Sequence, residues 1–211
     1  MFPLSFPSRA LLAAAVILGA GSAVHAQQIN SEYKITKVES NFLETPNFGG
    51  VRYDKRGYKP GNWLEVEVTF DWKPRLKEPK YTEELTFNFY ILLKNATQQY
   101  PKGALLVGSV TVVNVAQGSD MHTVVYVSPR TLARFFEGKI PPNAGAAVSA
   151  VAVTISKQGQ LVAEYLGGNY QSQWWSQYQQ VPGYVLTKSE TPFGPLAWDY
   201  FEAVKPKSTG Q

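Results

Sequence analysis

Hydrophobic and polar residues alternate over two long stretches of this chain, which is the pattern of β-strands with one buried face. Apolar side chains occupy every second position in residues 63–72, and the same spacing recurs in residues 85–93. The side chains expected to face a core are Leu64, Val66, Val68, Phe70 and Trp72 in the first stretch and Leu85, Phe87, Phe89, Ile91 and Leu93 in the second. The positions between them are mostly polar, so we expect antiparallel sheets with one face toward water.

Further strands are indicated at residues 33–39, 105–115 and 122–127, and a hairpin at residues 147–156 and 160–166 that closes around residues 157–159. The stretch 105–115 is almost entirely apolar, which predicts a central strand. Together these segments predict about seven strands.

One segment, residues 128–138, has the features of a helix. Ser128 is a favoured N-cap residue, Pro129 suits the first helical position, and Gly138 suits the end. We expect a short crossover helix that connects strands of opposite sheets. The fold predicted from these patterns is all-β, an antiparallel β-sandwich with one short crossover helix, and a barrel is the second choice.

The N-terminus has the pattern of a secretory signal peptide. Arg9 precedes the apolar run 10–20, and small residues end the segment at Ala26. As a helix the run would span roughly 17 Å, too short for a hydrocarbon core of roughly 30 Å. We therefore predict that residues 1–26 are cleaved and that residues 27–211 form a single exported domain without a transmembrane segment.

The chain has no cysteine and two histidines, of which His25 lies in the predicted signal peptide. Disulfides, thiol chemistry and the common zinc sites are thereby excluded within the exported chain, and we expect no metal and no cofactor. Ser119, Asp120 and His122 combine the residue types of a catalytic triad. In a strand, however, Asp120 and His122 share one face and Ser119 points away, so the sequence predicts that the protein is not an enzyme.

The formal net charge of +4 is too small and too dispersed for a nucleic-acid-binding protein. The densest basic segment, residues 52–59, interleaves cations with tyrosines. Its cations Arg52, Lys55, Arg56 and Lys59 are candidates for contact with an anionic surface, and the alternative is a solvated loop between strands.

Aromatic and glutamine residues gather without any charge in residues 170–180. Sugar rings stack on aromatic faces while amides bond their hydroxyl groups, so Tyr170, Trp174, Trp175 and Tyr178 are candidates for ligand stacking. The alternative is that the two tryptophans pack across a sheet, as large aromatic side chains usually do.

The C-terminal run 183–200 resembles the closing segment of a bacterial family of exported pilus-like proteins, and residues 33–39 and 63–68 resemble it more weakly. The resemblance implies an immunoglobulin-like sandwich related to that of archaeal type IV pilins, a role in a pilus or surface assembly, and no catalytic residues. It also implies pilus or cell-surface proteins, including further copies of this chain, as partners. The ordinary signal peptide differs from a type IV prepilin, which is cut before a hydrophobic assembly helix.

Two functional hypotheses follow. The first is a non-enzymatic structural or surface-assembly protein that acts through protein–protein contacts outside the cytoplasmic membrane. The alternative is a carbohydrate-binding or adhesin module that uses the aromatic segment Trp174–Tyr178.

Large apolar side chains also follow two prolines near the C-terminus, Pro192 and Pro195, which favour an extended path. These side chains are Phe193, Leu196, Trp198, Tyr200 and Phe201. We expect them to pack on their own sandwich; the alternative is donation of the segment to a neighbouring subunit.

Overall fold

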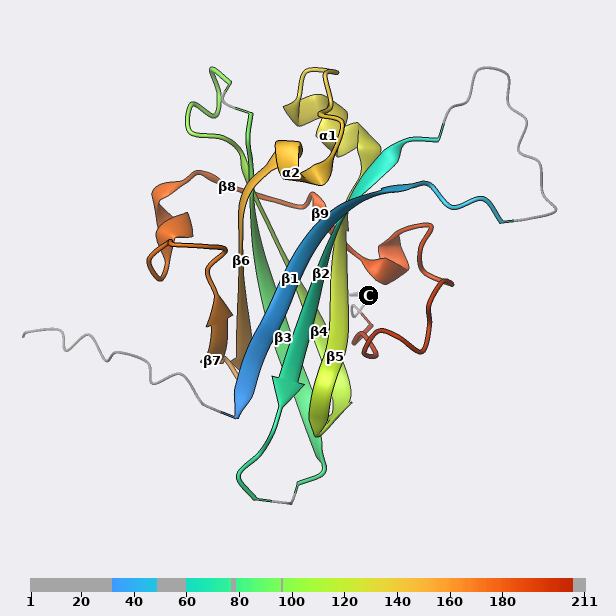
Figure 1. The fold of residues 1–211 in the computed structure, drawn as a ribbon, viewed down its shortest axis with the longest axis vertical. Coiled ribbons are helices and arrows are strands. Elements are labelled where there is room, and N and C mark those ends of the chain that lie inside the picture. The colour runs from blue at the N-terminus through green and yellow to red at the C-terminus, as the bar shows by residue number, and fades with distance from the viewer. Residues whose placement is uncertain (1–31, 49–59, 77–78, 96, 207–211) are drawn as a thin grey trace, which may run out of the picture.

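The computed structural model describes residues 32–48, 60–76, 79–95 and 97–206. Two sheets pack face to face (Figure 1), one with strand order β1-β2-β5-β9 and the other with order β7-β6-β3-β4-β8. The strands are β1 (Tyr33–Glu44), β2 (Asn62–Trp72), β3 (Tyr81–Leu93), β4 (Leu105–Ala116), β5 (Gly118–Val127), β6 (Val148–Lys157), β7 (Gln160–Tyr165), β8 (Gln180–Pro182) and β9 (Val185–Thr187). The prediction of an all-β, immunoglobulin-like sandwich is confirmed.

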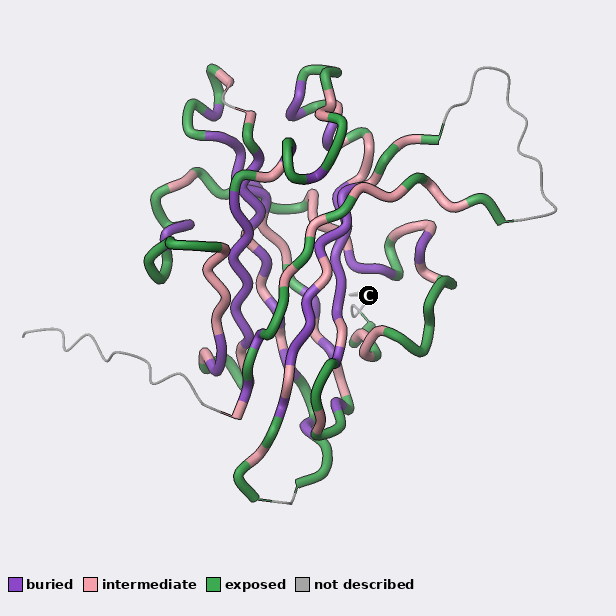
Figure 2. The backbone as a smooth tube through the Cα atoms, viewed as in Figure 1, coloured by how far each residue is buried: buried purple, intermediate pink, exposed green. Residues whose placement is uncertain are grey.

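The inner faces of β2 and β3 form the centre of the core, as their alternation predicts. All ten apolar side chains expected to point inward are at most 1% exposed. Phe70 and Phe87 meet across the two sheets with ring centroids 4.9 Å apart. Figure 2 shows the buried residues running along the facing strands. Because each large apolar side chain contributes about 1.5–3 kcal/mol on burial, these two strands account for much of the stability of the sandwich.

Helix α1 (Pro129–Phe135) begins as predicted, with the Ser128 hydroxyl accepting a hydrogen bond from the Thr131 N–H at 3.2 Å. It leads from β5 in one sheet toward β6 in the other, across one end of the sandwich (Figure 1). A second helix, α2 (Ala144–Ala147), is capped by Asn143 and was not expected, because four residues are too few to show a helical period.

The predicted β6–β7 hairpin is also present. Its two turn residues, Gln158 and Gly159, have φ values of 51° and 78°, the left-handed conformation of a two-residue type I′ turn. The prediction that residues 105–115 form the central strand is wrong, because β3 lies at the centre and β4 is flanked on its outer side by the short β8. The strand is apolar for another reason. Leu105 lies on the outer face of the sheet, where the segment that carries Trp174 covers it.

The chain passes from the second sheet to the first through the short strands β8 and β9. Gly183 joins them with a φ of 86°. A Cβ on Gly108 of β4 would lie 2.6 Å from the Cβ of Val185 in β9, so a glycine is required at this contact between the two sheets. β8 pairs parallel with β4, the single parallel pair among the described strands, and β9 pairs antiparallel with β5.

The predicted signal peptide and the basic residues Arg52, Lys55, Arg56 and Lys59 lie outside the described residues, and the predictions for them stay predictions. Within the described ranges, no helix has the length and apolar character needed to span a membrane.

Candidate functional site

Residues 188–205, which we call the cap, follow β9 and run over the outer face of the first sheet, to the right of β5 in Figure 1. The cap begins with a 3-10 helix, η2 (Lys188–Glu190), and continues as successive turns. In one of them the Gly194 N–H donates to the Thr191 carbonyl at 3.1 Å, which places Pro192 at the second turn position that proline favours. The extended path predicted from the prolines is therefore wrong.

Phe193 fixes the cap to the sheet. Its side chain is 5% exposed and stacks on Tyr126 of β5 at 4.7 Å, and its edge contacts Trp63 of β2 at 5.7 Å. The sequence predicts that the outer faces of these strands point to water. Here they are covered, and Glu65 and Thr69 are only 9% and 8% exposed.

Glu65 lies beneath the cap with its carboxylate buried. The Tyr126 hydroxyl donates a hydrogen bond to Oε2 of Glu65 at 2.9 Å. Burial raises the pKa of Glu65, and the hydrogen bond from Tyr126 opposes this only in part. Burial and the neighbouring carboxylate likewise raise the pKa of Tyr126.

Lys188 is the buried cation of the cap, with 8% of its surface exposed. Its Nζ donates to the Gly194 carbonyl at 2.9 Å and lies 5.4 Å and 5.6 Å from the ring centroids of Trp198 and Phe201. Burial lowers the pKa of Lys188. The ammonium thus holds the loop in shape from within, through cation–π contacts and one carbonyl.

His122 and Tyr200 form a second attachment of the cap. Their rings stack at 4.1 Å, and Oε1 of Glu67 lies 2.9 Å from Nδ1 of His122 and accepts a hydrogen bond from the Tyr200 hydroxyl at 2.8 Å. Burial and the contact with Glu67 raise the pKa of Tyr200 to about 12. Asp120 lies 4.0 Å from Nε2 of His122, on the same face as expected, whereas no hydrogen bond among the described residues joins Ser119 to His122.

The end of the cap joins the two sheets. The Glu202 N–H donates to the His122 carbonyl in β5 at 2.9 Å. The Val113 N–H of β4 then donates to the Ala203 carbonyl, and the Lys205 N–H donates to the Thr111 carbonyl, both at 2.8 Å. This seam, residues 202–205, closes the side of the sandwich next to β9.

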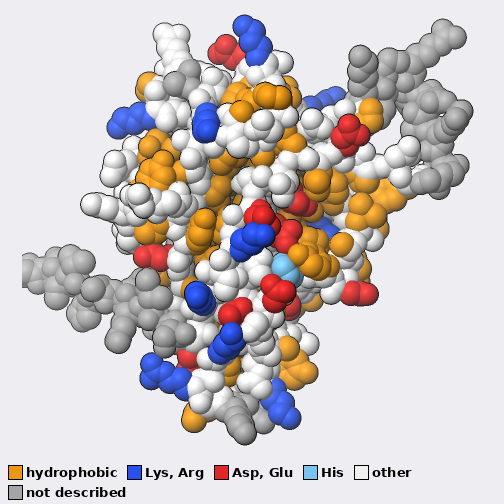
Figure 3. Space-filling model, viewed as in Figure 1, with side chains coloured by type: hydrophobic (Ala, Val, Ile, Leu, Met, Phe, Trp, Pro, Cys, Tyr) orange, Lys and Arg blue, Asp and Glu red, His pale blue; other side chains and the backbone are white. Residues whose placement is uncertain are grey.

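A cavity of about 410 Å³ lies between the cap and the end of β1. Its lining residues are Leu43, Glu44, Pro46, Glu65, Tyr126, Lys188, Phe193, Leu196, Ala197, Tyr200 and Phe201. We call it the cap pocket. Three large side chains of the cap stay open to solvent: Leu196 is 39% exposed, Trp198 75% and Tyr200 49%. Figure 3 shows hydrophobic side chains gathered on this part of the surface beside the histidine.

The aromatic segment proposed for sugar stacking packs on the other sheet. Trp174 and Trp175 are 4% and 7% exposed. Trp175 stacks on Tyr90 at 4.3 Å, and the indole N–H of Trp174 donates to the Leu166 carbonyl at 3.1 Å. Tyr170 is 37% exposed, and Tyr178 packs against Trp174 with ring centroids 5.7 Å apart. The packing alternative is therefore the correct interpretation for the two tryptophans, whose faces are covered.

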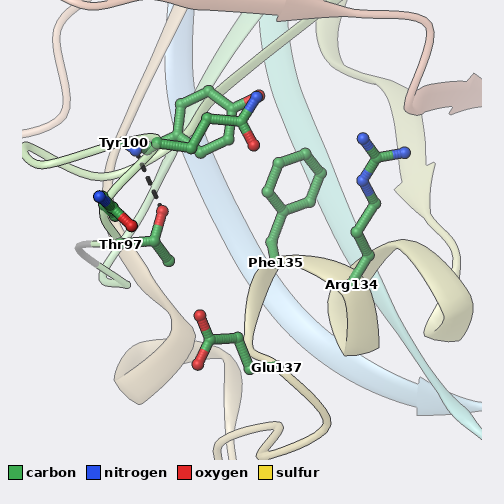
Figure 4. A pocket seen from close by; sticks show the side chains of 7 residues that line it. Thr97, Tyr100, Arg134, Phe135 and Glu137 are labelled. Atoms are coloured by element: carbon green, nitrogen blue, oxygen red, sulfur yellow. Dashed lines mark hydrogen bonds between the residues drawn. The ribbon is translucent and has the colours of Figure 1, made fainter.

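A second cavity, of about 420 Å³, lies beside α1 (Figure 4). Arg134 and Glu137 point to different sides of Phe135, and the Arg134 guanidinium donates to the Tyr184 hydroxyl at 2.7 Å. The polar groups do not converge on one point, so this cavity offers less chemistry than the cap pocket. No group of three or more His, Asp or Glu side chains in the described part of the chain is arranged to hold a metal ion.

The sequence indicated the apolar side chains of the cap, from Phe193 to Phe201, but not the buried charged groups Glu65 and Lys188. A signal for the start of the cap exists: Thr187 and Glu190 have the spacing of a capping box, and Glu190 accepts from the Thr187 N–H at 2.8 Å. No comparable signal marks Lys188 as buried, because a lysine in a polar stretch normally predicts exposure.

Comparison with known proteins shows that the chain has a family and a fold in common with other proteins. One family model matches residues 24–208. No curated protein matches the chain. Three solved chains match, among them a pilus-associated protein from Akkermansia muciniphila that is 25% identical, with a TM-score of 0.65 over 83% of this chain and 93% of the other. Since the family model spans nearly all of the sequence, the chain belongs to that family, and its fold is that of the Akkermansia protein.

Proposed function

We propose that this chain is an exported, non-enzymatic, pilus-related surface protein that works through protein–protein contacts. Its family and its likeness to a pilus-associated protein support a pilus-related surface role. The pattern of residues 9–26 supports export. A relationship of the sandwich to archaeal type IV pilins stays a prediction.

The observation that carries the proposal is the exposure of Trp198. An indole that is 75% exposed, on a loop held by Phe193 and the seam, is the kind of preorganised aromatic anchor found at interface hot spots. Because the loop is already fixed, a partner would bind it with little loss of conformational entropy. The covered faces of Trp174 and Trp175 disfavour the carbohydrate-binding alternative.

The test is photo-crosslinking in the producing cells. Trp198→benzoylphenylalanine is compared with the same change at Leu76, which is also 75% exposed but lies in the loop between β2 and β3. We expect a crosslinked surface protein at position 198, either another protein or a further copy of this chain, and none at position 76. Equal crosslinking at both positions, or none at either, contradicts the proposal.

A further inference from the structure

The charged side chains that the cap pocket offers to a ligand are acidic. Among the described residues that line it, Glu44 and Glu65 are the two carboxylates and Lys188 is the single cation. Lys188 is already engaged by the Gly194 carbonyl and two aromatic rings. Glu44, in contrast, is exposed, and no hydrogen bond or ion pair joins its carboxylate to another described residue.

The surrounding face of the first sheet also carries acidic side chains. Glu39 of β1 pairs in register with Glu67 of β2, and Asp120 lies beside His122. The nearest exposed cation on β1, Lys37, is paired with Glu39 at 2.8 Å. Figure 3 shows acidic side chains around the hydrophobic patch on this face. The chain as a whole carries a formal net charge of +4, so this local excess of acid is not a consequence of composition.

Apart from the two tyrosines, the remaining lining among the described residues is apolar. Phe193, Leu196 and Phe201 contribute walls, and the volume of about 410 Å³ lies toward the lower end of the roughly 300–1,000 Å³ typical of ligand pockets. A cavity of this size, open at a surface with an exposed indole beside it, suits a single inserted side chain.

We propose that the cap pocket binds one apolar side chain of a partner polypeptide other than this chain, whose flanking residues are lysine or arginine. This inference rests on the proposed function and specifies the partner's chemistry. The inserted side chain removes apolar surface from water, and the flanking cations lie against Glu44 and the acidic face. Electrostatic complementarity of this kind discriminates between partners more than it adds affinity, so charge reversal in the partner is the sharpest probe.

Three peptides test the proposal by NMR titration into protein comprising residues 27–211. The first is acetyl-Gly-Lys-Leu-Lys-Gly-amide, the second replaces both lysines with glutamate, and the third replaces the leucine with glycine. We expect the first to shift the amide signals of Leu43, Leu196 and Phe201 and to bind about tenfold more tightly than either control, a difference of about 1.4 kcal/mol.

A matched pair of variants localises the effect. Glu44→Gln, on an exposed side chain, is expected to reduce the preference for the lysine peptide several-fold. Glu83→Gln, an exposed carboxylate on β3 of the other sheet, is expected to leave it unchanged. The same spectra show whether each variant keeps the fold.

Equal binding of the lysine and glutamate peptides, or shifts confined to another surface, overturns the inference. Shifts of the same amides on raising protein concentration alone assign the pocket to a second copy and also overturn it. A crosslink at position 198 together with no lysine preference rejects this inference while leaving the proposed function standing. Absence of any crosslink at that position rejects the proposed function itself.

Discussion

Replacing Phe193 with alanine tests whether the cap is a fixed part of the fold. Phe193 is 95% buried between Tyr126 and Trp63, with 5% of its surface exposed. Truncating a buried phenylalanine to alanine costs about 3–5 kcal/mol, and aromatic pairs contribute about 0.5–1.5 kcal/mol beyond their area. Since Phe193 also borders the cap pocket, the loop relaxes in part, and we expect a loss of about 3 kcal/mol in unfolding free energy.

Urea unfolding followed by circular dichroism measures this loss. Trp198→Ala is the control, because it removes a larger aromatic side chain from the same loop where 75% of the residue is exposed. Its loss is limited to the contact with Lys188 and is expected to stay below about 1 kcal/mol. A loss below 1 kcal/mol for Phe193→Ala, or equal losses for the two variants, would refute the reasoning that the cap is anchored by Phe193.

Three further predictions address other features. Because burial raises the pKa of Glu65 in the folded state, the charged carboxylate destabilises the fold above that pKa, and Glu65→Gln should be more stable than the parent at pH 8. This advantage should shrink as the pH falls toward the ordinary carboxyl pKa of about 4.3. Urea midpoints measured from pH 8 to pH 4 test this, and an advantage that grows at low pH would contradict the assignment. Gly167→Ala should cost more than about 2 kcal/mol in thermal unfolding, since the new Cβ would lie 2.2 Å from the Val151 carbonyl at a φ of 72°. N-terminal sequencing of protein recovered from outside the cytoplasmic membrane should begin at Gln27, and an intact Met1 would disprove the cleavage site.

The alternation in residues 63–72 correctly predicted which side chains point into the core, because this direction depends on the strand itself. Leu64 and Phe70 point inward by period two whatever covers the outer face. Covering of the outer face is different. Glu65 lies beneath Phe193, more than 100 positions later in the chain, and a local pattern contains no information about such a partner.

Other errors have the same physical origin. Leu105 is apolar because it packs on the outer face of the sheet, which made β4 resemble the strand at the centre of the sheet. Trp174 and Trp175 are suited by residue type either to sugar binding or to packing on the outer face of a sheet. Only their contacts with Tyr90 and Leu166 distinguish the two. The strands of three residues, β8 and β9, are too short to show alternation.

The seam determines when the sandwich can be completed. Thr111 pairs with Lys205, and the His122 carbonyl pairs with Glu202, so the backbone groups on this side of β4 and β5 have no seam partner until residues 202–205 have left the ribosome. During synthesis that side is an open edge, the part of a β protein most prone to pair with other chains. A nascent chain in which both sheets have formed therefore still requires residues 202–205 to close the sandwich, and folding is completed only after these residues have been synthesised.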